Sequence, residues 1–70
     1  MIDLFVLGVN IQMQRKLLKL TQQELAAKAN ISTIYLKQVE NGKANLSFKI
    51  FNSICEALEL QTEFILKPKK

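Results

Sequence analysis

The sequence predicts an all-α fold: one domain over residues 1–70, built as a bundle of four to five helices with a short C-terminal β-strand. Apolar residues recur at intervals of three and four along most of the chain, and this interval is the period of an α-helix. Side chains that favour the N-cap position stand immediately before three of these periodic runs: Thr21, Ser32, and Asn45 or Ser47. The chain has 70 residues, of which 49% are hydrophobic, so it lies near the lower limit at which an apolar core suffices. This much apolar material in so small a domain indicates that a second copy or a partner buries some of it.

The composition excludes several classes of function. One cysteine and no histidine exclude a disulfide framework and an ordinary zinc site. The six carboxylates form no paired motif, and Gly8 and Gly42 form no phosphate loop. Cys55 lies near an apolar helix face, where a small buried thiol is expected. The sequence therefore predicts no enzymatic activity, no metal, no cofactor and no small-molecule substrate.

The charge balance points to an anionic partner. The formal net charge is +4, and the isoelectric point is about 9.5, which mildly favours nucleic acid. The apolar start, MIDLFVLGV, contains Asp3, has no basic leader and is too short to span a bilayer. We therefore expect a cytoplasmic protein without a membrane partner.

The first predicted helix covers residues 4–18 and has two apolar stripes. The stripe expected to face the core consists of Leu4, Leu7, Gly8, Ile11, Arg15 and Leu18. The second stripe consists of Val6, Val9, Met13 and Leu17. It would suit a contact with a second copy or a partner protein. Alternatively, Phe64, Leu66 or the N-terminal residues cover it.

The centre of the chain predicts two short helices joined by a tight turn, a helix-turn-helix over about residues 21–41. Thr21 and Glu24 form a capping box at the start of the second helix. Asn30 tolerates a left-handed backbone and ends it, and Ser32 caps the third helix. The residues expected to face the core are Leu25, Ala26, Ala29, Ile31, Leu36 and Val39.

A fourth helix, and then a strand, follow. The fourth helix begins after Asn45 or Ser47 and buries Ile50, Phe51, Ile54, Ala57 and Leu58. Residues 62–67 alternate between apolar and polar and are rich in Phe and Ile, which predicts a strand that ends at Pro68. A lone strand leaves backbone groups unpaired, so the simplest solution pairs it with the same segment of a second copy. The predicted dimer contacts are Thr62, Phe64, Ile65 and Leu66; a frayed tail or a short fifth helix is the alternative.

The order TQQELA…ANIS…LKQVENGK closely resembles the Cro/CI-type (Xre) helix-turn-helix family, and the likeness extends from about Leu7 to Leu58. Asn30 and Lys19 depart from the pattern, since the family commonly has glycine at both positions. The resemblance implies a lambda-repressor-like fold that binds double-stranded DNA, with residues 32–40 in the major groove.

The resemblance also implies roles for individual residues on the third helix. Thr33, Ile34 and Gln38 match the family's base-reading positions. Gln38 can pair with adenine, Thr33 can hydrogen-bond to several bases, and Ile34 can pack on a thymine methyl group. The alternative for Ile34 is an ordinary exposed apolar side chain.

Further residues are expected to contact the DNA backbone or to support the motif. Gln22 matches the family's phosphate clamp, while Lys37, Asn41, Lys43 and Asn45 are expected to add phosphate contacts. Lys28 and Lys49 either lie on the same side or only keep the protein soluble. Arg15 and Glu40 match positions that form an ion pair in the family, and a buried Arg is tolerable only when it is paired.

The ending, NLSFKIFNSICEALELQTEFILKPKK, is similar to that of HipB-like antitoxins, although Glu59 replaces their usual glycine. This likeness implies a homodimer joined through the strand, a palindromic operator near its own promoter, and a HipA-type kinase toxin as partner. Phage-type repressors and restriction-modification controllers share the same core. A different class of function is a protein-interaction module that neutralises a partner, with DNA binding secondary or lost.

Overall fold

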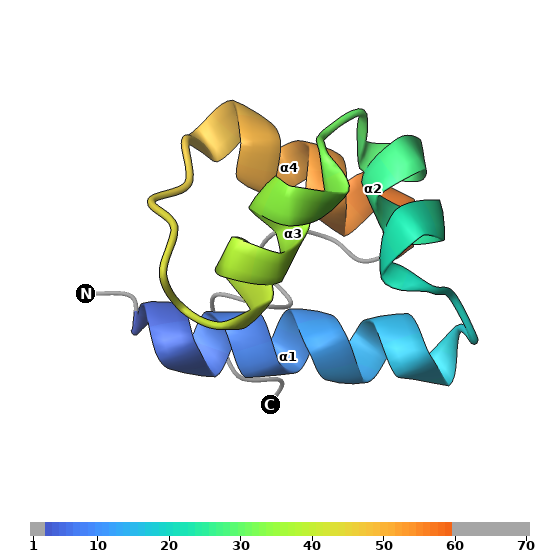
Figure 1. The fold of residues 1–70 in the computed structure, drawn as a ribbon, viewed down its shortest axis with the longest axis horizontal. Coiled ribbons are helices and arrows are strands. Elements are labelled where there is room, and N and C mark those ends of the chain that lie inside the picture. The colour runs from blue at the N-terminus through green and yellow to red at the C-terminus, as the bar shows by residue number, and fades with distance from the viewer. Residues whose placement is uncertain (1–2, 60–70) are drawn as a thin grey trace.

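Four α-helices make up residues 3–59, the part of the chain that the computed structural model describes. They are α1 (Leu4–Leu17), α2 (Gln22–Ala29), α3 (Thr33–Glu40) and α4 (Phe48–Ala57). In Figure 1 the long helix α1 lies along one side of the molecule, and the three shorter helices are grouped against it. The all-α prediction is confirmed, and the predicted strand over residues 62–67 lies outside the described residues.

Each helix begins where a side chain takes up its free N–H groups. The capping box forms as predicted: Thr21 Oγ1 accepts from the Glu24 N–H at 3.0 Å, and Glu24 Oε1 accepts from the Thr21 N–H at 2.8 Å. Ser32 caps α3, and Ser47 rather than Asn45 caps α4. Asp3 caps α1 by accepting from the backbone N–H groups of Phe5 and Val6, a role that the sequence analysis did not assign.

Within one or two residues of their ends, three of the helices are followed by a non-glycine residue in the left-handed conformation. Lys19 has φ 60°, Asn30 φ 60° and Glu59 φ 62°. These are the three positions at which the sequence departs from a glycine in the patterns that it resembles. The backbone therefore keeps the turn that a glycine would make, although a Cβ atom makes this conformation costly.

This geometry predicts that Lys19→Gly stabilises the protein. The left-handed conformation costs a non-glycine residue about 1–2 kcal/mol, and the backbone entropy of glycine offsets about 0.5–1 kcal/mol of that gain. Urea denaturation should show a net gain of about 0.5–1 kcal/mol for Lys19→Gly and a smaller gain for Asn30→Gly, since Asn tolerates this region. As a control, Ala27→Gly in the exposed interior of α2 should lose about 1 kcal/mol; an equal effect at both positions would contradict the prediction.

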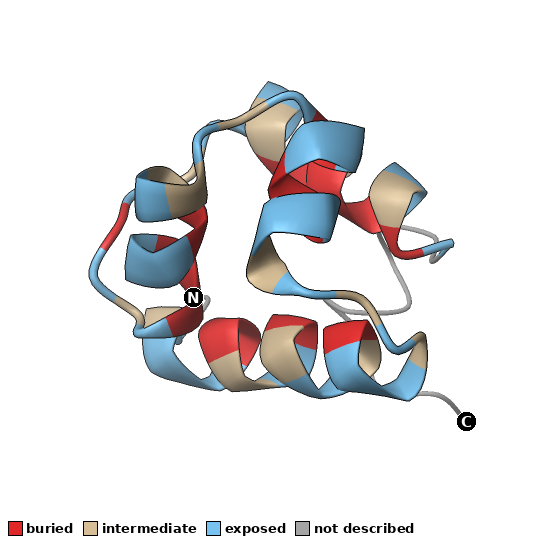
Figure 2. Cartoon of the chain, turned by 45° about the vertical axis from the view of Figure 1, so that its right-hand side comes forward, coloured by how far each residue is buried: buried red, intermediate tan, exposed pale blue. Residues whose placement is uncertain are grey.

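The core lies where α2, α3 and α4 meet the inner side of α1, and buried residues line this side of each helix in Figure 2. Its fully buried side chains are Ile11, Leu25, Leu36, Ile54, Cys55 and Leu58. The predicted inner faces of all four helices are confirmed, although several of the predicted residues are only partly buried at the edge of the core: Leu4, Leu18, Ile31, Ile50 and Ala57. Cys55 is buried, as expected for a small apolar side chain.

The second apolar stripe of α1 is on the surface of residues 3–59. Val6, Met13 and Leu17 are exposed, as is their neighbour Phe5, whereas Val9 is partly buried. Most of this stripe is therefore uncovered within residues 3–59.

Candidate nucleic-acid interface

Helix α3 presents one face to the core and the other to solvent. Ser32 Oγ accepts from the Tyr35 N–H at 3.0 Å and fixes the first turn. Leu36 and Val39 then point inward, while Ile34, Lys37 and Gln38 are exposed. Thr33 is partly buried, so it is less accessible than the sequence analysis expected. An exposed face with one apolar, one charged and one amide side chain can contact base edges and phosphates.

A buried ion pair holds α3 against α1. Arg15 Nε donates to Glu40 Oε2 at 2.7 Å, and Arg15 Nη2 donates to Glu40 Oε1 at 3.2 Å. The remaining guanidinium nitrogen, Nη1, donates to the Leu20 carbonyl at 2.9 Å and so ties the α1–α2 connection to the same point. The side chains of Arg15 and Glu40 are 9% and 2% exposed, so the expected ion pair is formed and nearly shielded from water.

Gln22 joins this network from the start of α2. Its Nε2 atom donates to Glu40 Oε1 at 3.0 Å, and the side chain is partly buried. One carboxylate thus connects α1, α2 and α3. Sequence reasoning missed this contact, since nothing in the spacing of residues 22 and 40 indicates that they meet.

The exposed start of α2 lies next to this network. The capping box takes up the N–H groups of Thr21 and Glu24. The N–H groups of Gln22 and Gln23 remain at the helix start, where the first-turn N–H groups have no partner within the helix. Such a helix start favours a phosphate group.

Tyr35 orders the loop that follows α3. Its hydroxyl group donates to the Asn45 carbonyl at 2.9 Å, and the Lys43 N–H donates to the Gln38 carbonyl at 2.8 Å. Asn41, Lys43 and Asn45 are exposed on this loop. The expected phosphate-contacting residues of the loop are therefore held beside α3. The sequence analysis did not single out Tyr35.

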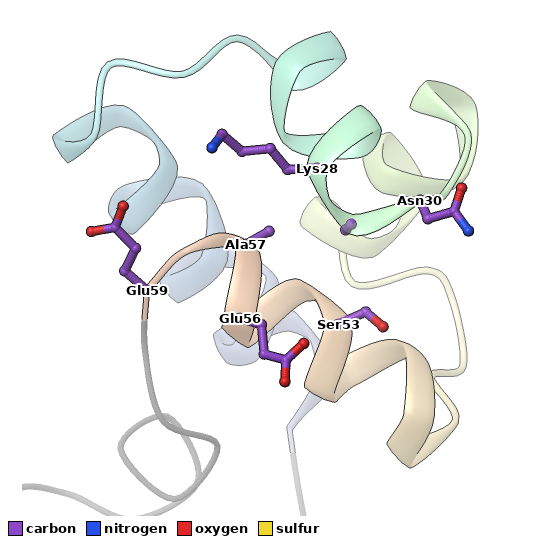
Figure 3. A pocket seen from close by; sticks show the side chains of 7 residues that line it. Lys28, Asn30, Ser53, Glu56, Ala57 and Glu59 are labelled. Carbon is purple, nitrogen blue, oxygen red and sulfur yellow. The ribbon is translucent and has the colours of Figure 1, made fainter.

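Lys28 is not among the residues described above. It lines a hollow between the C-terminal ends of α2 and α4. Figure 3 shows Lys28 near this hollow together with Glu56 and Glu59. The hollow has a volume of about 350 Å³. Acidic neighbours make this region a poor place for a phosphate, which favours the alternative that Lys28 is a solvating charge. Lys49 is exposed in the first turn of α4.

Residues 3–59 contain neither a candidate membrane-spanning helix nor a candidate metal site. None of the helices in this range combines the length and the apolar character that crossing a membrane requires. The same range holds no group of three or more His, Cys, Asp or Glu side chains placed to bind a metal ion.

Comparisons with known proteins agree with this geometry. The sequence model described as helix-turn-helix matches residues 11–65. The immunity repressor protein of Bacillus phage phi105 is 39% identical over 59 residues, which are 84% of this chain and 41% of that protein. The chain thus spans less than half of the repressor's length.

Two solved structures superpose closely. The restriction-modification controller protein C.AhdI from Aeromonas hydrophila has a TM-score of 0.87 at 25% identity, over 90% of this chain and 96% of that chain. The N-terminal DNA-binding domain of SinR from Bacillus subtilis has a TM-score of 0.83 at 26% identity, over 93% of this chain and 96% of that chain. The predicted lambda-repressor-like arrangement of helices is confirmed.

Proposed function

This chain belongs to the helix-turn-helix family, and we propose that it is a transcriptional repressor that binds DNA by placing α3 in the major groove. The observation that carries the proposal is the exposed face of α3, held in one orientation by the carboxylate of Glu40. A recognition helix needs such support because its side chains must reach base edges at fixed positions.

We propose that three side chains of α3 contact the base edges and so recognise the DNA sequence. Gln38 pairs with an adenine, Ile34 packs on a thymine methyl group, and Thr33 hydrogen-bonds to a base. The 72% exposure of Ile34 supports this role, since so open an apolar side chain on α3 is available to a groove. Because Thr33 is partly buried, we expect its contact at the edge of the interface.

Backbone contacts set the register of the complex. The start of α2, with Gln22, faces one phosphate, and Lys37, Asn41, Lys43 and Asn45 supply others. Because Gln22 also donates to Glu40, the phosphate clamp and the recognition helix are joined by one hydrogen bond. Affinity should then fall with salt, with a slope of about 0.9 per neutralised phosphate.

The oligomeric state and the protein partner are the next part of the proposal. We infer a homodimer on a palindromic operator, formed through residues 62–67, and acting in the cytoplasm where the DNA is. The likeness of the C-terminal sequence to HipB-like antitoxins supports a HipA-type kinase toxin as partner. The identity of 39% to a phage immunity repressor favours instead a phage-type repressor without a toxin. A kinase-like gene next to this one would separate the two.

Replacement of Gln38 tests the DNA-binding proposal. We expect Gln38→Ala to weaken operator binding by about 1–3 kcal/mol, since one bidentate base contact has that value. Thr33→Ala should have a smaller effect. The measurement is a mobility shift with DNA from upstream of the coding region, alongside a scrambled sequence that both variants should bind as the parent does.

Two further variants complete that test. Asn10→Ala, an exposed amide on α1, is the matched control and should leave operator affinity unchanged. Lys43→Ala should weaken operator and scrambled DNA equally and reduce the salt slope by about 1. Unchanged operator affinity in Gln38→Ala and Thr33→Ala would refute the proposal and favour the protein-interaction module.

A further inference from the structure

The outer face of α1 is an apolar row that is largely exposed among residues 3–59. We define this face as Phe5, Val6, Val9, Met13 and Leu17. Four of its members are strongly exposed: Phe5 64%, Val6 51%, Met13 58% and Leu17 75%. Single exposed apolar residues are normal, but a continuous apolar patch marks a contact surface.

The geometry of α1 makes this face continuous. Phe5, Val9, Met13 and Leu17 follow one another at steps of four residues, which places them in one row along the helix. This row lies opposite the buried row that contains Leu7 and Ile11. A helix that is apolar on both sides is typical of a buried helix rather than one at a surface.

We propose that residues 60–66 of the same chain cover the outer face of α1. The described chain ends beside the C-terminal part of this helix, since Gln14 Nε2 donates to the Leu58 carbonyl at 3.4 Å. Gln14 is the immediate neighbour of Met13 and lies one helical turn from Leu17. Residue 60 therefore starts next to the surface that needs a cover.

The length of the segment fits the distance. Phe5 lies nine positions before Gln14, which is about 13.5 Å along the helix axis. Seven residues in extended form span about 23 Å, enough to pass around the side of α1 and reach its far end. The segment LQTEFIL contains four large apolar side chains, Leu60, Phe64, Ile65 and Leu66.

Covalent attachment favours this segment over a separate copy of α1. A tethered segment meets the face at an effective concentration of the order of millimolar. One helix row of about 18 Å offers little area for two separate molecules, because stable interfaces bury about 1,200–2,000 Å². The proposal does not depend on DNA binding. If the segment is extended, its edges stay open for the pairing proposed above.

Cross-linking tests the proposal in the full chain. In a Cys55→Ala background, Phe64→Cys is combined in turn with one cysteine on the outer face: Val6→Cys, Val9→Cys or Met13→Cys. Mild oxidation should form a disulfide within one chain in at least one pair, seen by mass and on non-reducing gels. The matched control is Phe64→Cys with Gln23→Cys, which lies exposed on α2 and should not cross-link.

The other results would overturn the proposal. Disulfides between two chains would assign the outer face to a second copy. Absent disulfides, or disulfides equal to those of the control, would show that residues 60–66 do not lie there. Circular dichroism of each variant confirms that it is folded before oxidation.

A double-mutant cycle gives a second measurement. Met13→Ala and Phe64→Ala should each lower the equilibrium constant for folding about five- to tenfold, by loss of apolar contact. If the two side chains touch, the double variant should lose clearly less than the product of the two single effects. Multiplicative effects would contradict the proposed contact.

Discussion

Glu40→Ala should lose about 3–5 kcal/mol of stability, because it leaves the buried guanidinium of Arg15 without its partner. Glu40 accepts two hydrogen bonds from Arg15 and one from Gln22, and its side chain is 2% exposed. A domain of this size has a total stability of only about 4–10 kcal/mol. We therefore expect a large unfolded fraction at room temperature, measured by circular dichroism and urea denaturation.

Two other variants test whether the stability loss in Glu40→Ala comes from the unpaired charge of Arg15. The double variant Arg15→Met with Glu40→Met should recover most of the lost stability, because it removes both buried charges at similar volume. Lys16→Ala, an exposed cation next to Arg15, should change stability by less than about 0.5 kcal/mol. A loss below about 1 kcal/mol in Glu40→Ala would show that water reaches the Arg15 guanidinium.

Gly8→Ala should destabilise the protein by about 1–3 kcal/mol, as overpacking does, although helix propensity alone predicts a gain of about 1 kcal/mol. A Cβ atom at Gly8 would lie 2.4 Å from the Val39 carbonyl oxygen and 2.7 Å from the Glu40 carbonyl oxygen. Both atoms belong to the backbone at the end of α3, so relief requires α3 to move away from α1.

The same variant tests how α1 supports α3. If α3 shifts, the folded fraction of Gly8→Ala should also bind operator DNA more weakly than the parent does, measured by mobility shift after correction for unfolding. Asn10→Ala, two residues away on the exposed side of α1, should be neutral or slightly stabilising. A stabilised Gly8→Ala would refute the close approach of the two helices.

The helix boundaries could be predicted because their causes are local. Thr21 and Ser32 cap helices through hydrogen bonds that span three residues. Asn30 could be assigned to the turn since its backbone preference belongs to the residue itself. The start of α4 stayed open between Asn45 and Ser47, because both side chains can cap a helix and only the observed bond from the Ile50 N–H to Ser47 Oγ decides between them.

The candidate site was predictable where it depends on which side of a helix a residue occupies. Ile34, Lys37 and Gln38 are exposed because Leu36 and Val39 point to the core, and the helical period separates the two sets. Thr33 is more buried than its position on the outward side of α3 predicts, because the helical period does not show how closely the first turn of α3 packs. The base-reading roles stay predictions.

The family, the helices and their inner faces could be predicted from local patterns in the sequence, and the resemblance to the family implied the pairing of Arg15 with Glu40. Three contacts became known only from the folded chain: Gln22 donates to the Glu40 carboxylate, Tyr35 donates to the Asn45 carbonyl, and Gly8 lies directly against the backbone of α3. These contacts join different elements, and they depend on the distance and angle at which those elements meet. Such distances follow from the packing of all the core side chains together, so no short stretch of sequence specifies them.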